Sequence, residues 1–492
     1  MKTKKSFIKL LNISVVCLSV ISTVMCLNKR PAGYDLLFCL PVAYCICYLI
    51  CFMVYQKRSI LCMLISICAF LRYVLLPFVY SVEPVYGFSQ YSCHDTDILN
   101  KAIFLMSYEL FIVSLFVIVY NFFHKTKNIK DIFYNNKNEL GITRKYKFLG
   151  ISIFLIVAAM LIVRTPTVLN QINFLWLKSD TGNRVGAIAA TAGTFEMLIR
   201  QVLIIAILSF FVIIVSKIKE TRKNKNSGLI ISLIFAGVCT CIIISEQRSS
   251  QIYCAFASII LLSRLYPDRK KLIITSIVGV CIFVVALLTI YKTFFAFKYD
   301  SYIEALETEG LNLKTLAQNL EVYLLGPQTV ASSIEFAEKG SFTFSQFMYD
   351  IQRSFIGLSF FVKGGERYIT SESYNLFITN GSATSGYLLP LTGNAYGFVG
   401  FIFSPFLICF VYWIAFKLEK IMLSSKVEYI VFFSAYVYIR LATCMIFSNW
   451  ATILNLISSI LISAGIVYMF QIVIETLLRR KKIICFRESR SS

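Results

Sequence analysis

The chain has 492 residues, of which 58% are hydrophobic and only 15% are charged, and its formal net charge is +22. Its mean hydropathy is +0.73, and apolar runs of about 20 residues recur along its whole length. This composition excludes a soluble enzyme built around one core. It predicts an all-α polytopic membrane protein, because the runs are continuously apolar, whereas a membrane β-barrel would show alternating segments of about 10 residues.

Twelve apolar runs are predicted to be membrane-spanning helices. In chain order they cover residues 7–27, 34–55, 59–82, 101–123, 148–163, 196–216, 228–245, 249–266, 272–292, 394–416, 428–448 and 451–477. The first run starts with lysines, as a signal peptide does, but no small-residue cleavage site follows it. We therefore expect it to remain as an anchor.

Basic residues predict the orientation of these spans. With the N-terminus inside and the side alternating at each span, most of the 48 Lys and Arg lie on the inner face, which agrees with the positive-inside rule. We expect the protein in the cytoplasmic (inner) membrane, with both termini in the cytoplasm. The lipid bilayer and its anionic inner lipids then account for the positive charge, which gives no reason to invoke nucleic acid.

The predicted connections divide the chain into three parts. Residues 1–292 hold the first nine spans and an outer loop at 164–195. Residues 293–393 form one large extracytoplasmic loop, and residues 394–492 hold the last three spans and a basic cytoplasmic tail. The large loop is the only connection long enough to be a domain-like insert.

Periodic apolar residues predict two amphipathic helices in the large loop. One covers residues 313–324 and stops at Gly326–Pro327, and the other covers residues 341–356. Such helices lie on the outer membrane surface or cap the bundle. The Gly, Ser, Thr, Asn and Tyr that follow them suit a sugar, and Tyr368 and Asn394 are the substrate-binding candidates in that stretch.

Arginines are the main candidates for a binding site. An Arg at the centre of a span costs about 2.5–3.5 kcal/mol on insertion scales, which makes Arg72 and Arg440 functional hypotheses. Arg184, Arg248, Arg353 and Arg367 lie on the predicted outer side. The guanidinium fork matches phosphate oxygens, so these residues predict a lipid-borne phosphate or diphosphate as ligand. Ser249 and Ser250 would let that phosphate approach the start of the eighth span.

Each arginine also has a simpler interpretation. Arg248 could pair with Glu246, Arg353 with Asp350 and Arg72 with Glu109 in the next span. Arg440 could extend its head to the membrane surface, and Arg184 and Arg367 could simply be solvated.

Two stretches resemble a known family. "SEQRSSQIYCAFASIILL", with an Arg-Ser start to a span, and "TGNAYGFVGFIFSPF", with a Gly-aromatic-Gly entry into the next one, occur with twelve spans and two outer loops after the fifth and ninth. This pattern resembles the Wzy-type polymerases of O-antigen or capsule repeat units, which are related to the O-antigen ligases. The family's spacing of an Arg, ten residues and a Gly is matched by Arg353 and Gly364, whereas Arg184 is followed at that spacing by Phe195.

The resemblance implies a metal- and nucleotide-independent glycosyltransferase. A growing glycan on undecaprenyl diphosphate would be moved onto an incoming lipid-linked repeat unit, with a chain-length regulator and a flippase of the same pathway as partners. Arg248, Arg353, Arg367 and Glu366 would be catalytic. Substrate would be bound by Arg72, Arg184, Arg440, Ser249, Ser250, Tyr368 and Asn394. Glu366, Asp350, His94 and Glu246 all remain candidates for the general base.

Other classes of protein are compatible with parts of the pattern. A flippase or exporter of lipid-linked oligosaccharide would have two similar halves and short outer loops, but here one outer loop is long. A metal-dependent lipid-phosphate-sugar transferase would carry paired carboxylates in its first outer loop, where only Asp35 is found. A structural or sensor protein is a further alternative.

Overall fold

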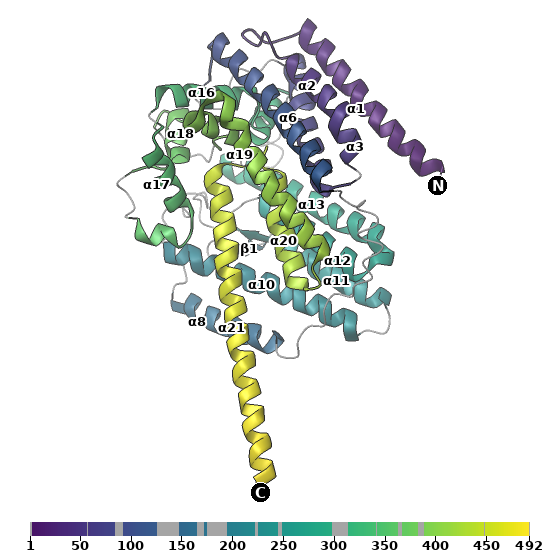
Figure 1. Ribbon diagram of the computed structural model, residues 1–492, viewed down its shortest axis with the longest axis vertical. Coiled ribbons are helices and arrows are strands. Elements are labelled where there is room, and N and C mark those ends of the chain that lie inside the picture. Colours follow the sequence, from purple (N-terminus) through teal and green to yellow (C-terminus); the bar gives the residue numbers. More distant parts are fainter. Residues whose placement is uncertain are drawn as a thin grey trace.

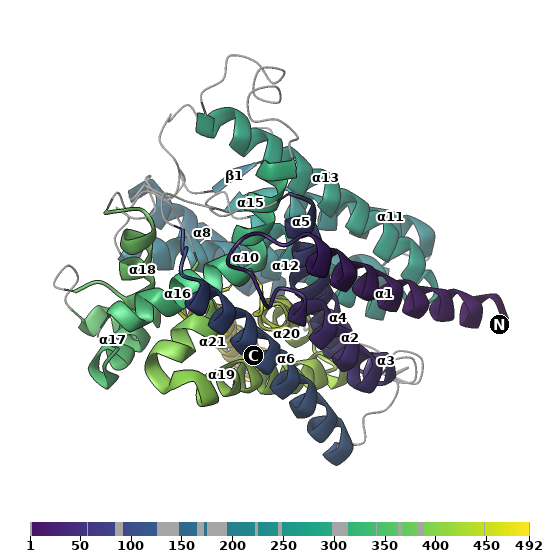
Figure 2. The ribbon, with the colours of Figure 1, turned by 90° about the horizontal axis from the view of Figure 1, so that it is seen from above.

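A computed structural model describes most of the chain. The described residues are 2–56, 58–83, 92–124, 147–164, 172–174, 194–221, 225–244, 248–297, 313–340, 342–362, 367–381, 388–446 and 448–491. Helices dominate these residues (Figures 1 and 2).

Three stretches of the chain carry the elements in order. Up to residue 164 they are α1 (Lys2–Asn28), α2 (Cys39–Cys47), η1 (Tyr48–Phe52), α3 (Met53–Tyr55), α4 (Ile60–Phe70), η2 (Leu71–Leu75), α5 (Leu76–Val82), α6 (Thr96–Phe123) and α8 (Lys147–Arg164). Next come β1 (Ile172–Phe174), α10 (Thr194–Thr221), α11 (Lys225–Thr240), β2 (Ile242–Ile244), α12 (Arg248–Leu265), η4 (Pro267–Arg269) and α13 (Lys270–Phe297). The rest are α15 (Leu313–Leu324), α16 (Pro327–Lys339), α17 (Phe344–Ser354), η5 (Leu358–Phe361), α18 (Thr370–Ile378), α19 (Leu391–Ser424), α20 (Glu428–Ala442) and α21 (Trp450–Ser491).

The helices agree with the prediction of a largely helical membrane protein. Among the described residues, five helical stretches are long and apolar enough to cross a bilayer: Leu10–Asn28, Ile60–Val82, Thr96–Phe123, Leu391–Ser424 and Trp450–Leu478. Four shorter apolar helices accompany them, at Cys39–Tyr55, Leu155–Arg164, Asn226–Thr240 and Gln251–Leu265. Each of the twelve predicted spans overlaps a helix or a run of helices. The count of twelve crossings stays a prediction.

One predicted span ends differently in the structure. The seventh apolar run was expected to be helical to residue 245, but α11 ends at Thr240 and the next residues form β2. β2 pairs antiparallel with β1, with Ile172 opposite Ile244. A strand of β-branched residues that pairs with a partner about 70 positions earlier leaves no periodic signal in an apolar run.

Helix α19 is interrupted near its start. Gly400 has φ 75° and ψ −178°, so the helix before it and the helix after it meet at a sharp bend. A residue with a Cβ adopts that backbone conformation only at a cost, and glycine does not. After the bend, Phe401 stacks on Phe104 and Tyr108 of α6. The tenth predicted span therefore consists of a short first helix and a longer second one.

The large loop folds back onto the bundle. α15 contacts α5, and α16 contacts α6 and α19, so both cap the end of the bundle at which α6 and α19 begin (Figure 1). The two helices predicted in this loop are confirmed as α15 and α17. α16 and α18 were not predicted. In α16 all residues from Pro327 to Ile334 are buried, and most of them are small or polar, so they show no apolar stripe.

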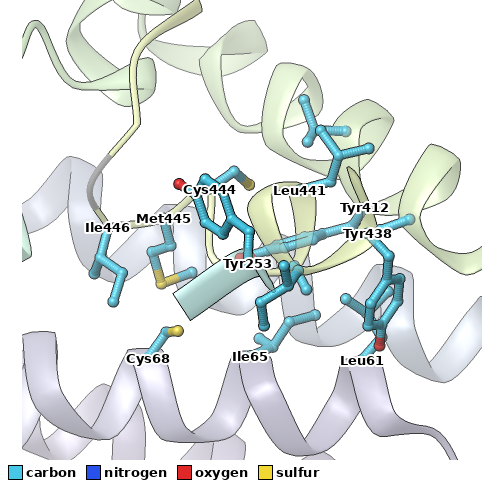
Figure 3. Close-up of a cluster of buried hydrophobic side chains, with 14 of the residues drawn as sticks. Leu61, Ile65, Cys68, Tyr253, Tyr412, Tyr438, Leu441, Cys444, Met445 and Ile446 are labelled. Carbon is cyan, nitrogen blue, oxygen red and sulfur yellow. The ribbon is translucent and has the colours of Figure 1, made fainter. Parts of the chain in front are cut away.

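A buried cluster joins the N-terminal and C-terminal halves of the bundle (Figure 3). It brings together Leu61, Ile65 and Cys68 of α4, Tyr253 of α12, Tyr412 of α19, Tyr438 and Leu441 of α20, and Cys444, Met445 and Ile446 of the connection to α21. The start of α12 and the end of α20 are therefore fixed against α4.

Candidate functional site

Arg440 lies in the last turn of α20 and is 7% exposed. Its guanidinium donates to the hydroxyl of Tyr253 on α12, and its Nη2 donates to Thr452 Oγ1 on α21 at 3.0 Å. The guanidinium carbon also lies 5.5 Å from the centre of the Tyr253 ring. Arg440 thus connects α20 with the beginnings of two other helices.

No carboxylate compensates this charge within the described part of the chain. The partners of Arg440 are neutral hydroxyls, and its Nε is buried without a hydrogen-bond partner. The C-terminal end of α20 favours a cation by about 0.3–1 kcal/mol, which is less than the roughly 2.5–3.5 kcal/mol cost of Arg at membrane depth. An anion would satisfy both the charge and the free donor.

Two further buried donors follow Arg440 in the sequence, eight and ten positions later. Ser448 Oγ and Trp450 Nε1 are buried and unpaired among the described residues. Ser448 precedes α21 and Trp450 is its first residue, and between them Asn449 Oδ1 accepts from Thr452 N at 2.7 Å. We name Arg440, Tyr253 and Thr452 the Arg440 cluster.

The Arg440 cluster lies at the predicted outer end of α12. α12 starts at Arg248, five residues before Tyr253, and α12 packs along α20. The structure therefore brings Arg248 and Arg440 to the same end of the bundle, although 192 positions separate them in the sequence. The side chains of Arg248, Ser249 and Ser250 lie outside the described part of the structure.

A second group of predicted residues surrounds Tyr349 of α17. The Arg367 guanidinium lies 5.8 Å from the centre of the Tyr349 ring, and the Tyr349 hydroxyl donates to the Arg367 carbonyl oxygen at 2.7 Å. Arg353, one turn after Tyr349, lies on the same side of α17. Tyr368 is exposed next to Arg367. We name Tyr349, Arg353, Arg367 and Tyr368 the Tyr349 group.

Arg353 does not form the simple ion pair with Asp350. Asp350 Oδ1 accepts instead from Gln346 Nε2 at 2.8 Å and from Thr370 N at 3.0 Å. Burial raises the pKa of Asp350, and its hydrogen bonds with Thr370 and Gln346 offset only part of this effect. Asp350 thus holds the start of α18, and with it Arg367, while Arg353 is left without a carboxylate partner among the described residues.

The two groups are connected through α21. Thr452 belongs to the Arg440 cluster, and Ser458 Oγ of the same helix accepts from Ile356 N, just after Arg353, at 3.0 Å. At 1.5 Å per residue, the six positions between Thr452 and Ser458 correspond to about 9 Å along the helix axis. Both groups of arginines are therefore anchored to the first three turns of one helix.

Arg72 forms the ion pair with Glu109 that was one of its two interpretations from the sequence. Its Nη1 lies 3.1 Å from Glu109 Oε1 of α6, and its Nε donates to the Leu325 carbonyl at 2.9 Å. Glu109 Oε2 accepts from Thr392 of α19. Arg72 and Glu109 therefore join α6, α19 and the turn between α15 and α16.

Glu321 of α15 is a buried carboxylate that the sequence did not single out. It accepts from Tyr80 at 2.5 Å and from Thr329 N at 2.6 Å. It thereby caps the N-terminus of α16. Burial raises the pKa of Glu321. Tyr80 lies 241 positions away from Glu321 in the sequence. The sequence therefore indicated only the turn at Gly326–Pro327, and not the buried contacts of Glu321.

The remaining predicted residues are not brought into either group. Asn394 is buried in the first turn of α19, beside Gly393, which packs against Ser333 of α16. Arg184, Glu246 and Glu366 lie outside the described residues.

Comparisons with known proteins give no relative. No family model, no curated protein and no solved structure matches this chain.

Proposed function

We propose that this protein joins undecaprenyl-diphosphate-linked oligosaccharide repeat units into a surface polysaccharide, at the outer face of the cytoplasmic membrane. The observation that carries the proposal is Arg440, a buried arginine with neutral partners, a free Nε and no carboxylate among the described residues. A phosphate of a lipid-linked substrate has the charge and the acceptor oxygens that this site lacks. The resemblance of the sequence to Wzy-type polymerases supports the same ligand.

The proposed reaction is a glycosyl transfer. The bond between the anomeric carbon of the growing glycan and its diphosphate oxygen breaks, and a hydroxyl of the incoming repeat unit forms the new glycosidic bond. The hydroxyl proton passes to a base, for which Glu366 is our candidate, and the lipid diphosphate leaves. Arg440 and Arg248 stabilise the charge that develops on that diphosphate, and each such preorganised donor is worth about 10²–10³ in rate.

The Tyr349 group has the chemistry to hold the second substrate. Arg353 and Arg367 lack carboxylate partners within 4 Å in the described structure, and Tyr349 and Tyr368 add aromatic faces and hydroxyls. Both groups are anchored to α21, which suits a reaction between two lipid-linked molecules. The twelve-span topology, with the large loop outside, belongs to this proposal.

A lipid-linked oligosaccharide flippase is the alternative. Its supporting observation is the interruption of α19 at Gly400, since discontinuous helices line substrate sites in many transporters. A flippase moves the intact lipid-linked oligosaccharide and leaves its bonds unchanged.

One reconstitution distinguishes these functions. The purified full-length protein in liposomes is given the lipid-linked oligosaccharide extracted from cells that lack this gene, without nucleotide. A polymerase yields longer glycans and releases undecaprenyl diphosphate in equal amount to the bonds formed. Movement of unchanged lipid-linked oligosaccharide across the bilayer, with no longer product, would favour the flippase and reject the polymerase.

A further inference from the structure

α17 and η5 of the large loop present large apolar side chains on the outside of the protein. Phe344 is 77% exposed and Met348 39%, while Leu358 is 43% and Phe361 88% exposed. Ser345 and Gln352 are also exposed, but they are uncharged. Exposed apolar groups of this size, gathered in fewer than twenty residues, indicate a surface that contacts another apolar phase.

The polar residues of the same helix face inward. Gln346, Asp350 and Ser354 are buried, and Asp350 bonds to Gln346 and to the start of α18. A helix on the surface of a soluble domain has the opposite arrangement, with its apolar stripe inside. α17 is therefore built to have protein on its polar side and a nonpolar medium on the other.

This surface continues into helices long enough to cross the membrane. On one side, Phe347 packs against Phe398 of α19 with ring centres 5.2 Å apart, and Ile402 and Phe403 follow as exposed side chains. On the other side, Ile356 N donates to Ser458 Oγ of α21, and Leu461 is exposed close by in that helix. α17 and the segment after it thus contact α19 and α21, two helices that also carry exposed apolar side chains.

We propose that α17 and η5 face the membrane, with Phe344, Met348, Leu358 and Phe361 inserted among the acyl chains of the lipid. The partner of this surface is the bilayer that surrounds the protein. Of the two helices predicted in the large loop, α15 caps the bundle and α17 lies in the lipid.

The placement has a consequence for the Tyr349 group. Tyr349 and Arg353 lie on α17 and Arg367 packs against the Tyr349 ring, so the lipid contact of α17 brings these residues to the membrane surface. A phosphate carried by a lipid reaches that surface without leaving the membrane. The lipid contact of α17 does not depend on the proposed enzyme activity.

Fluorescence quenching by brominated lipids tests the inference. Phe361→Trp is introduced into the full chain, purified and reconstituted in liposomes with or without bromine in the middle of the acyl chains. The unsubstituted protein supplies the background of its three native tryptophans. Phe403→Trp on α19 is the lipid-facing control, and Tyr368→Trp on the polar side is the water-facing control.

We expect the brominated lipid to remove most of the fluorescence added by Phe361→Trp, as for Phe403→Trp, and aqueous iodide to leave it unchanged. Tyr368→Trp should respond in the opposite way. Quenching of Phe361→Trp by iodide but not by bromine would overturn the inference. Protection from both quenchers would also overturn it, because a second copy of the protein would then cover α17. If Phe361→Trp does not yield folded protein, Phe344→Trp gives the same test.

Discussion

Replacing Glu109 by Gln should destabilise the protein strongly. The change keeps the shape of the side chain but removes the negative charge opposite Arg72, in a pair that is 0% and 1% exposed. Arg72 then keeps the Leu325 carbonyl and an uncharged amide, and its Nη2 already has no partner. Breaking one side of a buried ion pair costs about 3–5 kcal/mol.

The expected magnitude can be translated into a melting temperature. An unfolding entropy of about 2.1 cal/mol/K per residue over 492 residues corresponds to roughly 1 kcal/mol/K. Glu109→Gln should therefore lower the melting temperature by about 3–5 °C. The double variant Arg72→Met, Glu109→Leu removes both charges and replaces them with apolar groups, so it should lie closer to the unsubstituted protein.

The assay is thermal unfolding of the three purified proteins in one detergent, followed by loss of the monodisperse peak in size-exclusion chromatography. Polymer formation is measured in parallel in cells. A Glu109→Gln protein with unchanged stability and no polymer would refute our interpretation. Arg72 would then bind substrate and would not serve mainly as a bridge.

Three further predictions concern the topology, the α15–α16 turn and Asp350. The topology is tested with an impermeant thiol reagent on intact cells, or on spheroplasts if an outer membrane blocks access. The reagent should label Asn380→Cys directly, but Asn135→Cys only after permeabilisation. Equal labelling of the two positions would contradict the twelve-span topology. Gly326→Ala should lower stability by about 1–3 kcal/mol in thermal unfolding, because the new Cβ would collide with Glu321 Oε2; unchanged stability would show that this packing is wrong. Because burial raises the pKa of Asp350, its contribution to the stability of the α17–α18 contact is present below its ordinary pKa and is lost as the pH rises through the raised value. In limited proteolysis, the α17–α18 region should thus be more resistant in acid than at neutral pH. Asp350→Asn keeps the acceptor oxygen and should be resistant at both pH values. If the pH response persists in Asp350→Asn, another group causes that response.

The helices of the membrane part were predictable because each depends on a local property. Apolar runs predicted where helices occur in the membrane part, except for the strand at the end of the seventh run, and periodic apolar residues predicted α15 and α17. α16 was missed because its buried residues are mostly small or polar, and such residues are buried only when neighbouring elements enclose them. The bend at Gly400 was missed because a glycine in a Gly-aromatic-Gly segment is compatible with both a straight helix and a break.

The candidate site was only partly predictable. The cost of charges in a membrane identified Arg72 and Arg440 equally, since both lie inside apolar runs. Their environments differ through long-range contacts: Arg72 has Glu109, whereas Arg440 has hydroxyls from α12 and α21. Tyr253 and Thr452 could not be recognised as neighbours of Arg440 before the helices were packed.

The proposed function depends most on the arginines at the start of α12 and the end of α20, which would hold the diphosphate of the substrate. Arg248→Lys and Arg440→Lys keep the charge and lose the bidentate fork. Arg264→Lys is the matched control, because Arg264 lies at the opposite end of α12 and donates to the Met422 carbonyl at 3.0 Å, a bond that Lys can also make. Polymer length is read from a gel beside a blot of the membrane-inserted protein.

We expect Arg248→Lys and Arg440→Lys to lose most of the polymer at a normal protein level, by about 10²-fold or more if each removes one preorganised donor. Arg264→Lys should make polymer of full length. Full-length polymer from stably inserted Arg248→Ala and Arg440→Lys proteins would contradict a diphosphate site at these arginines.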